Sequence, residues 1–197
     1  NDNLVHGSIP SCIGNLTKLK WLSLTKNALT GPIPPGIGKL GGLQQLWLSS
    51  NRLTGTVPEE LGMLDALQMV YLHNNSLTGT MPSSVGNCSK LEMLSLHTNT
   101  LSGSLPPSLG RLQNLIYLRL GSNSLSGSIP DSLGQMANLQ EMYLLGNRLS
   151  GSLPSTIGQL RKLTKLLVHN NHLSGSIPVT ISNLTNLAHF TASNNAL

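Results

Sequence analysis

Charged and aromatic side chains are both scarce in this sequence. Asp, Glu, Lys and Arg make up 10% of the 197 residues, and Phe, Trp and Tyr make up 3%. A disordered polyelectrolyte needs far more charge, so that class is excluded. Hydrophobic residues still reach 39%, which is enough for one core, and leucine must fill most of it. The formal net charge of +5 is mildly basic and indicates no particular class of partner.

Long apolar runs and targeting segments are also missing. No stretch approaches the roughly 18 to 20 unbroken apolar residues of a membrane span. No basic region followed by an apolar region resembles a signal peptide. We therefore expect no membrane contact within this segment.

What the sequence does contain is a strict 24-residue repeat. Asparagine recurs at every 24th position from Asn3 to Asn195. One glycine column and one proline column share this period, and a second glycine column lapses only at Ser182. No insertion or deletion interrupts the period. One unit cannot bury its own leucines, so the units must stack to form a continuous core.

Within each unit the leucines alternate with other residues. Leu22 and Leu24 alternate with Trp21, Ser23 and Thr25. A period of two predicts a short strand whose leucines point inward. The asparagine that follows can both donate and accept hydrogen bonds where the chain leaves the strand, so we assign the asparagine column a structural role.

The second part of each unit carries glycine and proline. Gly31 allows a turn that a Cβ atom would obstruct, and Pro34 fixes φ at the start of the outer segment. Residues 35–40 are too few and too rich in glycine for an α-helix. The outer segment is therefore predicted to form 3₁₀ turns or irregular coil.

The spacing Leu-x-x-Leu-x-Leu-x-x-Asn-x-Leu resembles that of the leucine-rich repeat family over nearly the whole chain. The continuation Leu-Thr-Gly-x-Ile-Pro-x-x-Ile-Gly-x-Leu in residues 29–40 resembles the plant-specific class of 24-residue repeats. The resemblance implies a leucine-rich repeat solenoid of the α/β type, a right-handed curved superhelix. Its parallel β-sheet would lie on the concave side, with short second strands after the Asn-x-Leu corner and 3₁₀ or irregular segments on the convex side.

Residues 1–197 are expected to form a single solenoid domain of about eight repeats. The chain starts in the middle of a unit at Asn1 and stops just past a corner at Leu197. The paired-cysteine caps that the resemblance implies are absent, and Phe190 and Ala192 replace leucines in the last unit. The expectation is an uncapped fragment of a longer chain.

The two cysteines are predicted to be unpaired. Cys88 falls in a leucine column and should be buried as a small hydrophobic residue, whereas Cys12 falls on the exposed convex side. Three units separate them, which is about 14 Å at a strand spacing of ~4.8 Å. A disulfide needs Cα atoms within about 7 Å.

Four Asn-x-Ser/Thr sequons provide candidate glycosylation sites, at Asn15, Asn74, Asn87 and Asn183. Asn15, Asn87 and Asn183 share one convex column, where glycans would leave the concave sheet free. Asn74 ends a strand, where a glycan would crowd that sheet. The shared column favours a glycoprotein of the secretory pathway that is extracellular or forms an ectodomain at the cell surface.

The outward positions of the predicted concave strands carry most of the aromatic and histidine side chains. Five of the six aromatic residues and four of the six histidines fall there. Exposed aromatic, Met and Arg side chains are typical of binding hot spots. The alternative is that they pair across strands and only stabilise the sheet. The candidate ligand-binding residues are Trp21, Trp47, Met69, Tyr71, His73, Met93, His97, Tyr117, Arg119 and Tyr143.

Two features of this face suggest specific chemistry. His73 and His97 are neighbours in one column, ~5 Å apart, and could titrate together. A metal would need a third ligand, for which Glu92 and Glu141 are only loose candidates, so no metal site is predicted. Arg119 could clamp a carboxylate. Some plant peptide receptors of the family that the chain resembles use an Arg-x-Arg pair for the end of the peptide, and this sequence has no such pair.

Neither catalysis, nor a cofactor, nor nucleic acid binding is predicted. The acidic residues are scattered, and no nucleophile, base and orienting group fall in phase. The glycines follow the repeat rather than a phosphate-binding loop. Basic residues cluster near both ends without a continuous basic groove between them, which argues against a nucleic acid partner.

The sequence therefore predicts a recognition module rather than an enzyme. By resemblance, it is the extracellular ligand-binding region of a plant-type receptor-like kinase or receptor-like protein. Such a region would bind a peptide or protein on its concave face and help a co-receptor to dock. Alternatives are a secreted inhibitor of a cell-wall-degrading glycoside hydrolase, similar to polygalacturonase inhibitors, and a scaffold subunit of a larger complex. A further alternative is ice binding by Ser/Thr columns such as Thr30, Thr54, Thr78 and Ser102.

Overall fold

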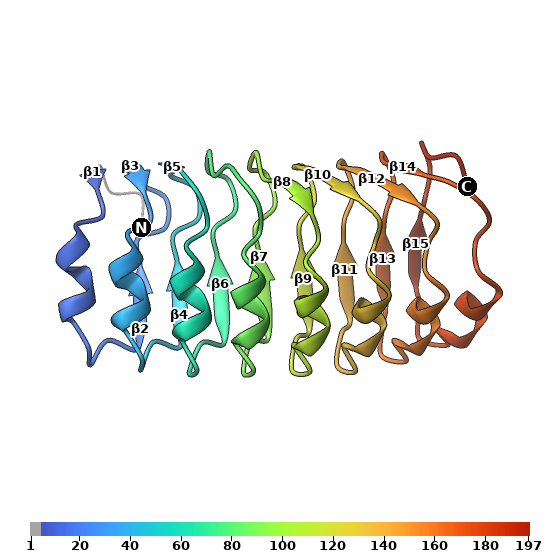
Figure 1. The fold of residues 1–197 in the computed structure, drawn as a ribbon, viewed down its shortest axis with the longest axis horizontal. Helices are drawn as coiled ribbons and strands as arrows, with labels where there is room; N and C mark the ends of the chain where they lie inside the picture. Colours follow the sequence, from blue (N-terminus) through green and yellow to red (C-terminus); the bar gives the residue numbers. More distant parts are fainter. Residues whose placement is uncertain (1–4) are drawn as a thin grey trace.

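A computed structural model describes residues 5–197, so Asn3, the first residue of the asparagine column, lies outside the described residues. Each repeat forms one coil, and the coils stack side by side into an elongated body (Figure 1). Each coil passes from a strand through a corner and a 3₁₀ helix back to the next strand. The predicted leucine-rich repeat solenoid is confirmed.

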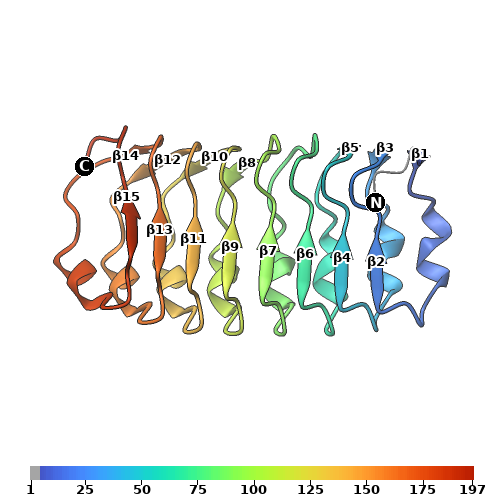
Figure 2. The ribbon, with the colours of Figure 1, turned by 180° about the vertical axis from the view of Figure 1, so that it is seen from behind.

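One side of the stack is an eight-stranded parallel sheet, called the concave sheet below (Figure 2). Its register keeps the 24-residue period, since Gln45 lies opposite Met69 and Leu46 lies opposite Val70. Each sequence column therefore forms a row across the sheet. The strands are β2 (Trp21–Ser23), β4 (Gln45–Trp47), β6 (Met69–Tyr71), β7 (Met93–Ser95), β9 (Tyr117–Arg119), β11 (Glu141–Tyr143), β13 (Lys165–Leu167) and β15 (His189–Thr191).

The convex side consists of short 3₁₀ helices, as the sequence predicts. Each one follows a proline with extended backbone, for example Pro34 at φ −71°. The proline ring fixes φ, and proline has no N–H with which to continue a helix that began earlier in the chain. The helices are η1 (Ser11–Asn15), η2 (Pro35–Lys39), η3 (Glu59–Met63), η4 (Ser83–Asn87), η5 (Pro107–Arg111), η6 (Asp131–Gln135), η7 (Ser155–Gln159) and η8 (Val179–Asn183).

Short second strands after the asparagine corner form two lateral sheets, which confirms that part of the prediction. One sheet contains β1 (His6–Ser8), β3 (Ala28–Pro32) and β5 (Arg52–Thr54), and the other contains β8 (Ser102–Ser104), β10 (Ser124–Gly127), β12 (Arg148–Gly151) and β14 (His172–Leu173). Isolated bridges between Thr56 and Thr78 and between Thr80 and Ser102 connect the two sheets.

The interior is a continuous column of leucines. Leu46, Leu118 and Leu166 are fully buried between the concave sheet and the convex helices. In the last coil, Phe190 and Ala192 occupy leucine positions and pack partly buried against the same core. Stacking thus removes from water the apolar surface that a single coil would expose.

The asparagine column forms a hydrogen-bonded ladder, which confirms its structural role. Asn99 Nδ2 donates to the carbonyl oxygen of Leu96 at 3.0 Å and to that of Leu72 in the preceding coil at 3.1 Å. Its Oδ1 accepts from the Leu77 N–H at 3.0 Å. Equivalent bonds recur from Asn51 to Asn195, so each asparagine joins two neighbouring coils.

A second ladder on the convex side is absent from the sequence-based prediction. Ser132 Oγ donates to the Pro107 carbonyl oxygen at 2.8 Å. A Cβ atom added to Gly110 would collide with the Ser132 carbonyl oxygen, so this glycine column allows the coils to approach. Hydroxyl residues equivalent to Ser132 recur at Ser84, Ser108, Thr156 and Thr180. Their 24-residue period is the pattern that would have revealed this ladder.

Candidate functional site

The candidate ligand-binding residues all lie on the concave sheet or at the ends of its strands, but their exposure differs. Trp21 is 67% exposed and Trp47 is 37% exposed. Met93 belongs to an outward column, but the expectation that it is exposed is wrong, because its exposed fraction is only 7%. Met93 lies in register between Met69 and Tyr117. Side chains at opposite positions of neighbouring strands are about 5 Å apart, so two large neighbours account for its burial.

A row of rings crosses β4, β6 and the end of β7. Trp47 and Tyr71 meet edge to face with centroids 5.6 Å apart, so the cross-strand pair weighed in the sequence analysis does form. Tyr71 is followed by His73 at 6.0 Å, and His73 stacks on His97 at 4.4 Å. Together with Thr25 and Ser49, the first two rings line a hollow of about 190 Å³. This row, called the ring row below, consists of Trp47, Tyr71, His73 and His97.

The two histidines of the ring row are held in the neutral form. Burial, the neighbouring His97 and the Arg119 guanidinium together lower the pKa of His73 to about 4. Burial, followed by the charge of Arg119, also lowers the pKa of His97. Ser95 Oγ is 3.1 Å from His73 Nδ1, so the two side chains share a hydrogen bond. Among residues 5–197, no three His, Cys, Asp or Glu side chains gather closely enough to hold a metal ion.

A charged cluster occupies the neighbouring strands β9, β11 and β13, and consists of Arg119, Glu141 and Lys165. Glu141 receives hydrogen bonds from Arg119 Nη2 at 2.8 Å and from Lys165 Nζ at 3.1 Å. Burial acts to raise the pKa of Glu141, but the hydrogen bonds from Arg119 and Lys165 outweigh it and hold that pKa below its usual range. The cluster therefore keeps one net positive charge at neutral pH. The sequence analysis identified Arg119 but not this cluster. The signal in the sequence that could have indicated it is the placement of Glu141 and Lys165 in one column, 24 residues apart.

Two tyrosine rings hold Arg119 in place. Its guanidinium carbon lies 5.5 Å from the centroid of Tyr117 and 5.2 Å from that of Tyr143. Both distances fit cation–π attraction. The Arg119 Nε is buried and has no hydrogen-bond partner among the described residues. Arg119 is therefore an ordered cation with unused donor capacity.

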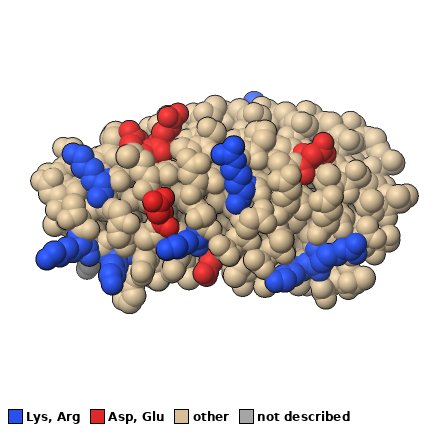
Figure 3. All heavy atoms as spheres, turned by 60° about the horizontal axis from the view of Figure 1, so that its bottom comes forward, with Lys and Arg blue, Asp and Glu red and all other residues tan. Residues whose placement is uncertain are grey.

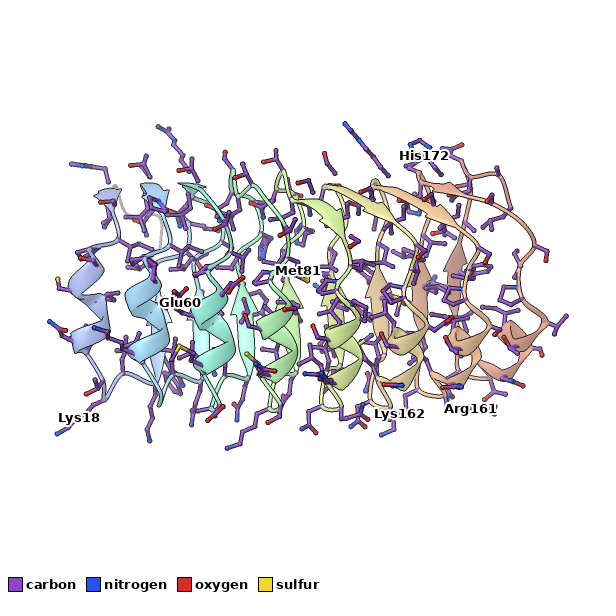
Figure 4. The ribbon with its side chains drawn as sticks, viewed as in Figure 1. Lys18, Glu60, Met81, Arg161, Lys162 and His172 are labelled. Carbon is purple, nitrogen blue, oxygen red and sulfur yellow. The ribbon has the colours of Figure 1, made fainter. Side chains whose placement is uncertain are left out.

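Charges elsewhere are dispersed. Acidic and basic side chains alternate over the underside of the stack, with no continuous basic groove in that view (Figure 3). Lys18 lies at one end of the lower edge and Arg161 and Lys162 lie toward the other, while Glu60 stands on the convex side (Figure 4). Between residues 5 and 197, no helix is both long enough and apolar enough to cross a membrane.

The cysteines and sequons occupy the predicted surfaces. Cys12 is exposed and Cys88 is buried, both as free thiols, and burial raises the pKa of Cys88 to about 11. The sequon residues Asn15, Asn87 and Asn183 each end a convex 3₁₀ helix; the first two are exposed and the third is half-buried. Asn74 is exposed at the corner after β6, with φ at 54°.

Comparison with known proteins identifies the family. A leucine rich repeat profile matches residues 17–77 and 89–149, and another matches residues 162–184. The chain belongs to the leucine-rich repeat family. No curated protein matches the chain in sequence.

Solved leucine-rich repeat structures resemble the chain over nearly all of its length. The ectodomain of the Arabidopsis thaliana membrane receptor kinase GASSHO1/SCHENGEN3, solved with CASPARIAN STRIP INTEGRITY FACTOR 2, is 39% identical, with a TM-score of 0.97 over 99% of this chain and 23% of its own. The Arabidopsis receptor kinase HAESA, solved with the peptide hormone IDA and the co-receptor SERK1, is 32% identical, with a TM-score of 0.87 over 99% of this chain and 37% of its own.

A plant ice-binding protein with the same fold is 31% identical, with a TM-score of 0.80 over 97% of this chain and 61% of its own. By comparison, the chain spans well under half the length of the two receptor ectodomains described above. These neighbours include ligand-binding receptor modules, and one of them binds ice, so the fold is compatible with more than one activity.

Proposed function

We propose that this segment is part of the extracellular ligand-binding region of a plant-type receptor-like kinase or receptor-like protein, and that it binds a peptide or protein along the concave sheet. The likeness to plant receptor kinase ectodomains, one of them solved with a peptide hormone, supports the class of protein. HAESA was solved with both IDA and the co-receptor SERK1, and the proposal for this segment likewise includes a co-receptor as a second partner.

The observation that carries this proposal is the gathering of rings and an ordered cation on one face. The ring row and the charged cluster occupy adjacent strands, from β4 to β13. Stabilisation of the sheet alone does not explain Trp21, which stays 67% exposed opposite Gln45. Aromatic and Arg side chains presented together are the residues on which binding energy usually concentrates.

A peptide selection tests the proposal. A displayed library of random peptides about 12 residues long would span ~40 Å when extended, enough to cross the whole site. Selection on the purified chain should enrich a sequence motif, and replacing Trp47, Tyr71 and Tyr117 with Ala should abolish it while the circular dichroism spectrum stays unchanged. Met63→Ala is the control, because Met63 is 65% exposed on the convex side. Failure to enrich any motif would refute binding by the concave sheet.

The location can be tested through the glycans. Expressed through the plant secretory pathway, the chain should carry N-glycans at Asn15 and Asn87, which are exposed at the ends of η1 and η4. Peptide mass spectrometry before and after enzymatic deglycosylation locates them. Secreted chain without any glycan at these two residues would count against the ectodomain assignment.

Ice binding is a second candidate, favoured by the lateral sheets and by the ice-binding neighbour. Thr30, Thr54 and Thr78 form an exposed row of hydroxyl groups, which Ser102 continues. However, the hydroxyls of Thr30 and Thr78 donate to glycine carbonyls of the preceding coil at 3.3 Å, so they also serve the stack. Inhibition of ice recrystallisation by the chain, lost on changing Thr54 and Thr78 to Lys, would favour this function over peptide recognition.

A further inference from the structure

We infer that the concave sheet binds its peptide in one direction, with an acidic side chain of the ligand at Arg119 and an apolar side chain on Trp47 and Tyr71. This inference rests on the proposed function and specifies the ligand that the same site selects.

The concave face is divided into a neutral half and a charged half. From β2 to β7, the outward positions carry no Asp, Glu, Lys or Arg; they hold aromatic, Met, His, Gln, Ser and Thr side chains, among them Trp47 and Tyr71. From β9 to β13 they carry the charged cluster. A peptide laid across the strands therefore meets different chemistry at its two ends, and reversing it would place a charge against the rings.

Arg119 is ordered before any ligand arrives. The rings of Tyr117 and Tyr143 flank its guanidinium, and Glu141 accepts one hydrogen bond from Nη2 at 2.8 Å. Its side chain is nevertheless 33% exposed. A guanidinium held in this way loses less conformational entropy when it binds a carboxylate than a mobile one would.

Arg119 also keeps both charge and donors for a ligand. A guanidinium has five N–H donors. Among the described residues only Nη2 is hydrogen-bonded, and Nε is buried, so the donors left for a ligand are the remaining Nη N–H groups of this partly exposed side chain. Glu141 offsets one of the two positive charges of the cluster, because it bridges Arg119 and Lys165. The neighbouring His73 and His97 contribute no charge at neutral pH. The surroundings of Arg119 are therefore positive overall, and the group to which it donates a further hydrogen bond should be an anion.

The spacing between the two halves defines the motif. Trp47 and Arg119 hold the same position in β4 and β9, which are separated by β6 and β7. Three strand spacings correspond to about 14 Å, and an extended peptide advances ~3.3 Å per residue. The acidic residue should therefore lie about four positions from the apolar residue, always on the same side of it.

The peptide selection described above tests this when the library is fused to its carrier at the carboxyl end, so that every carboxylate in the random segment comes from Asp or Glu. The chain should enrich Asp or Glu several-fold at one position, about four residues from an enriched apolar position. Arg119→Gln should return the acidic position to the library background and keep the apolar preference, whereas Trp47→Ala should do the reverse. Arg148→Gln is the matched control, because Arg148 is an exposed arginine on the lateral strand β12 and its loss changes the net charge equally.

A change on the peptide side requires no variant protein. A selected peptide in which Gln replaces the acidic residue should bind the unchanged chain about tenfold more weakly, because a neutral amide replaces the charged acceptor of the Arg119 hydrogen bond. The same replacement should leave binding to Arg119→Gln unaffected. Peptides that bind without an acidic preference, or whose acidic preference survives Arg119→Gln, would overturn this inference while the proposed function stands. If no peptide is enriched at all, the proposed function itself fails.

Discussion

Replacing Asn99 with Ala tests the ladder that joins the coils. The Leu77 N–H would lose its hydrogen bond to Asn99 Oδ1, the only one that it makes within residues 5–197. The Leu72 and Leu96 carbonyl oxygens would each lose one bond but keep another, from Asn75 and Asn123 respectively. An unpartnered buried N–H costs about 1 to 3 kcal/mol, and each lost bond to a carbonyl that keeps a second partner costs about 0.5 to 1 kcal/mol. The free energy of unfolding should fall by about 3 kcal/mol.

Urea denaturation followed by circular dichroism measures this change, provided that the dependence on urea concentration stays the same. Asn114→Ala is the control, because Asn114 is exposed and its side chain makes one hydrogen bond to the described part of the chain, to the Ser89 carbonyl oxygen at 2.8 Å. The expected loss of stability is about 0.5 kcal/mol. Asn99→Asp should destabilise at least as much as Asn99→Ala, since it keeps the acceptor for Leu77 but buries a charge beside two carbonyls. Equal stabilities of Asn99→Ala and Asn114→Ala would refute the reasoning.

Three further changes probe the packing, the ring row and the cysteines. Gly110→Ala should lower the free energy of unfolding by about 1 to 3 kcal/mol, because the added Cβ would meet the Ser132 carbonyl oxygen. Gly41→Ala is the control and should change stability little, because a Cβ there meets open space. Urea denaturation compares the two variants. The pKa of His73 is 6.5 in the unfolded chain and about 4 in the folded chain, so between these pH values the unfolded chain binds the proton more readily. The free energy of unfolding should therefore fall as the pH drops from 6.5 to 4, by about 1 kcal/mol because the ring is partly exposed. His73→Gln should flatten that part of the stability–pH curve, and an unchanged slope would exclude this source. A thiol reagent should modify one cysteine, Cys12, in the folded chain and two after denaturation, because Cys88 is buried; rapid reaction of both would contradict the structure.

The ring row shows how much of the site can be predicted from the sequence. Period-two alternation was enough to place Trp47, Tyr71 and His73 on the outer side of the sheet, because side chains of a strand point alternately to its two faces. The strict 24-residue period was enough to place them in neighbouring rows, since parallel strands stay in register. Contact between the rings followed from the strand spacing. The direction and depth of each side chain did not.

Met93 and Arg119 illustrate two properties that the sequence does not predict, the exposure of a side chain and its pairing. Both were correctly assigned to outward columns, yet Met93 is covered by its neighbours, and Arg119 turns sideways along the sheet to reach Glu141 on the next strand. Exposure and pairing depend on the lengths and rotamers of side chains on three adjacent strands at once. A single column read along the sequence does not contain that information.

The repeat alone determined the stacked coils, the buried leucines and the structural role of the asparagines, because the same local geometry recurs without interruption and only stacking can bury its apolar side. Tertiary structure decided that the concave face has a neutral half with a ring row and a charged half with an ordered arginine. The physical reason is that these properties arise between coils, from rings that stack and charges that pair across neighbouring strands, and each coil contributes only one member of every pair.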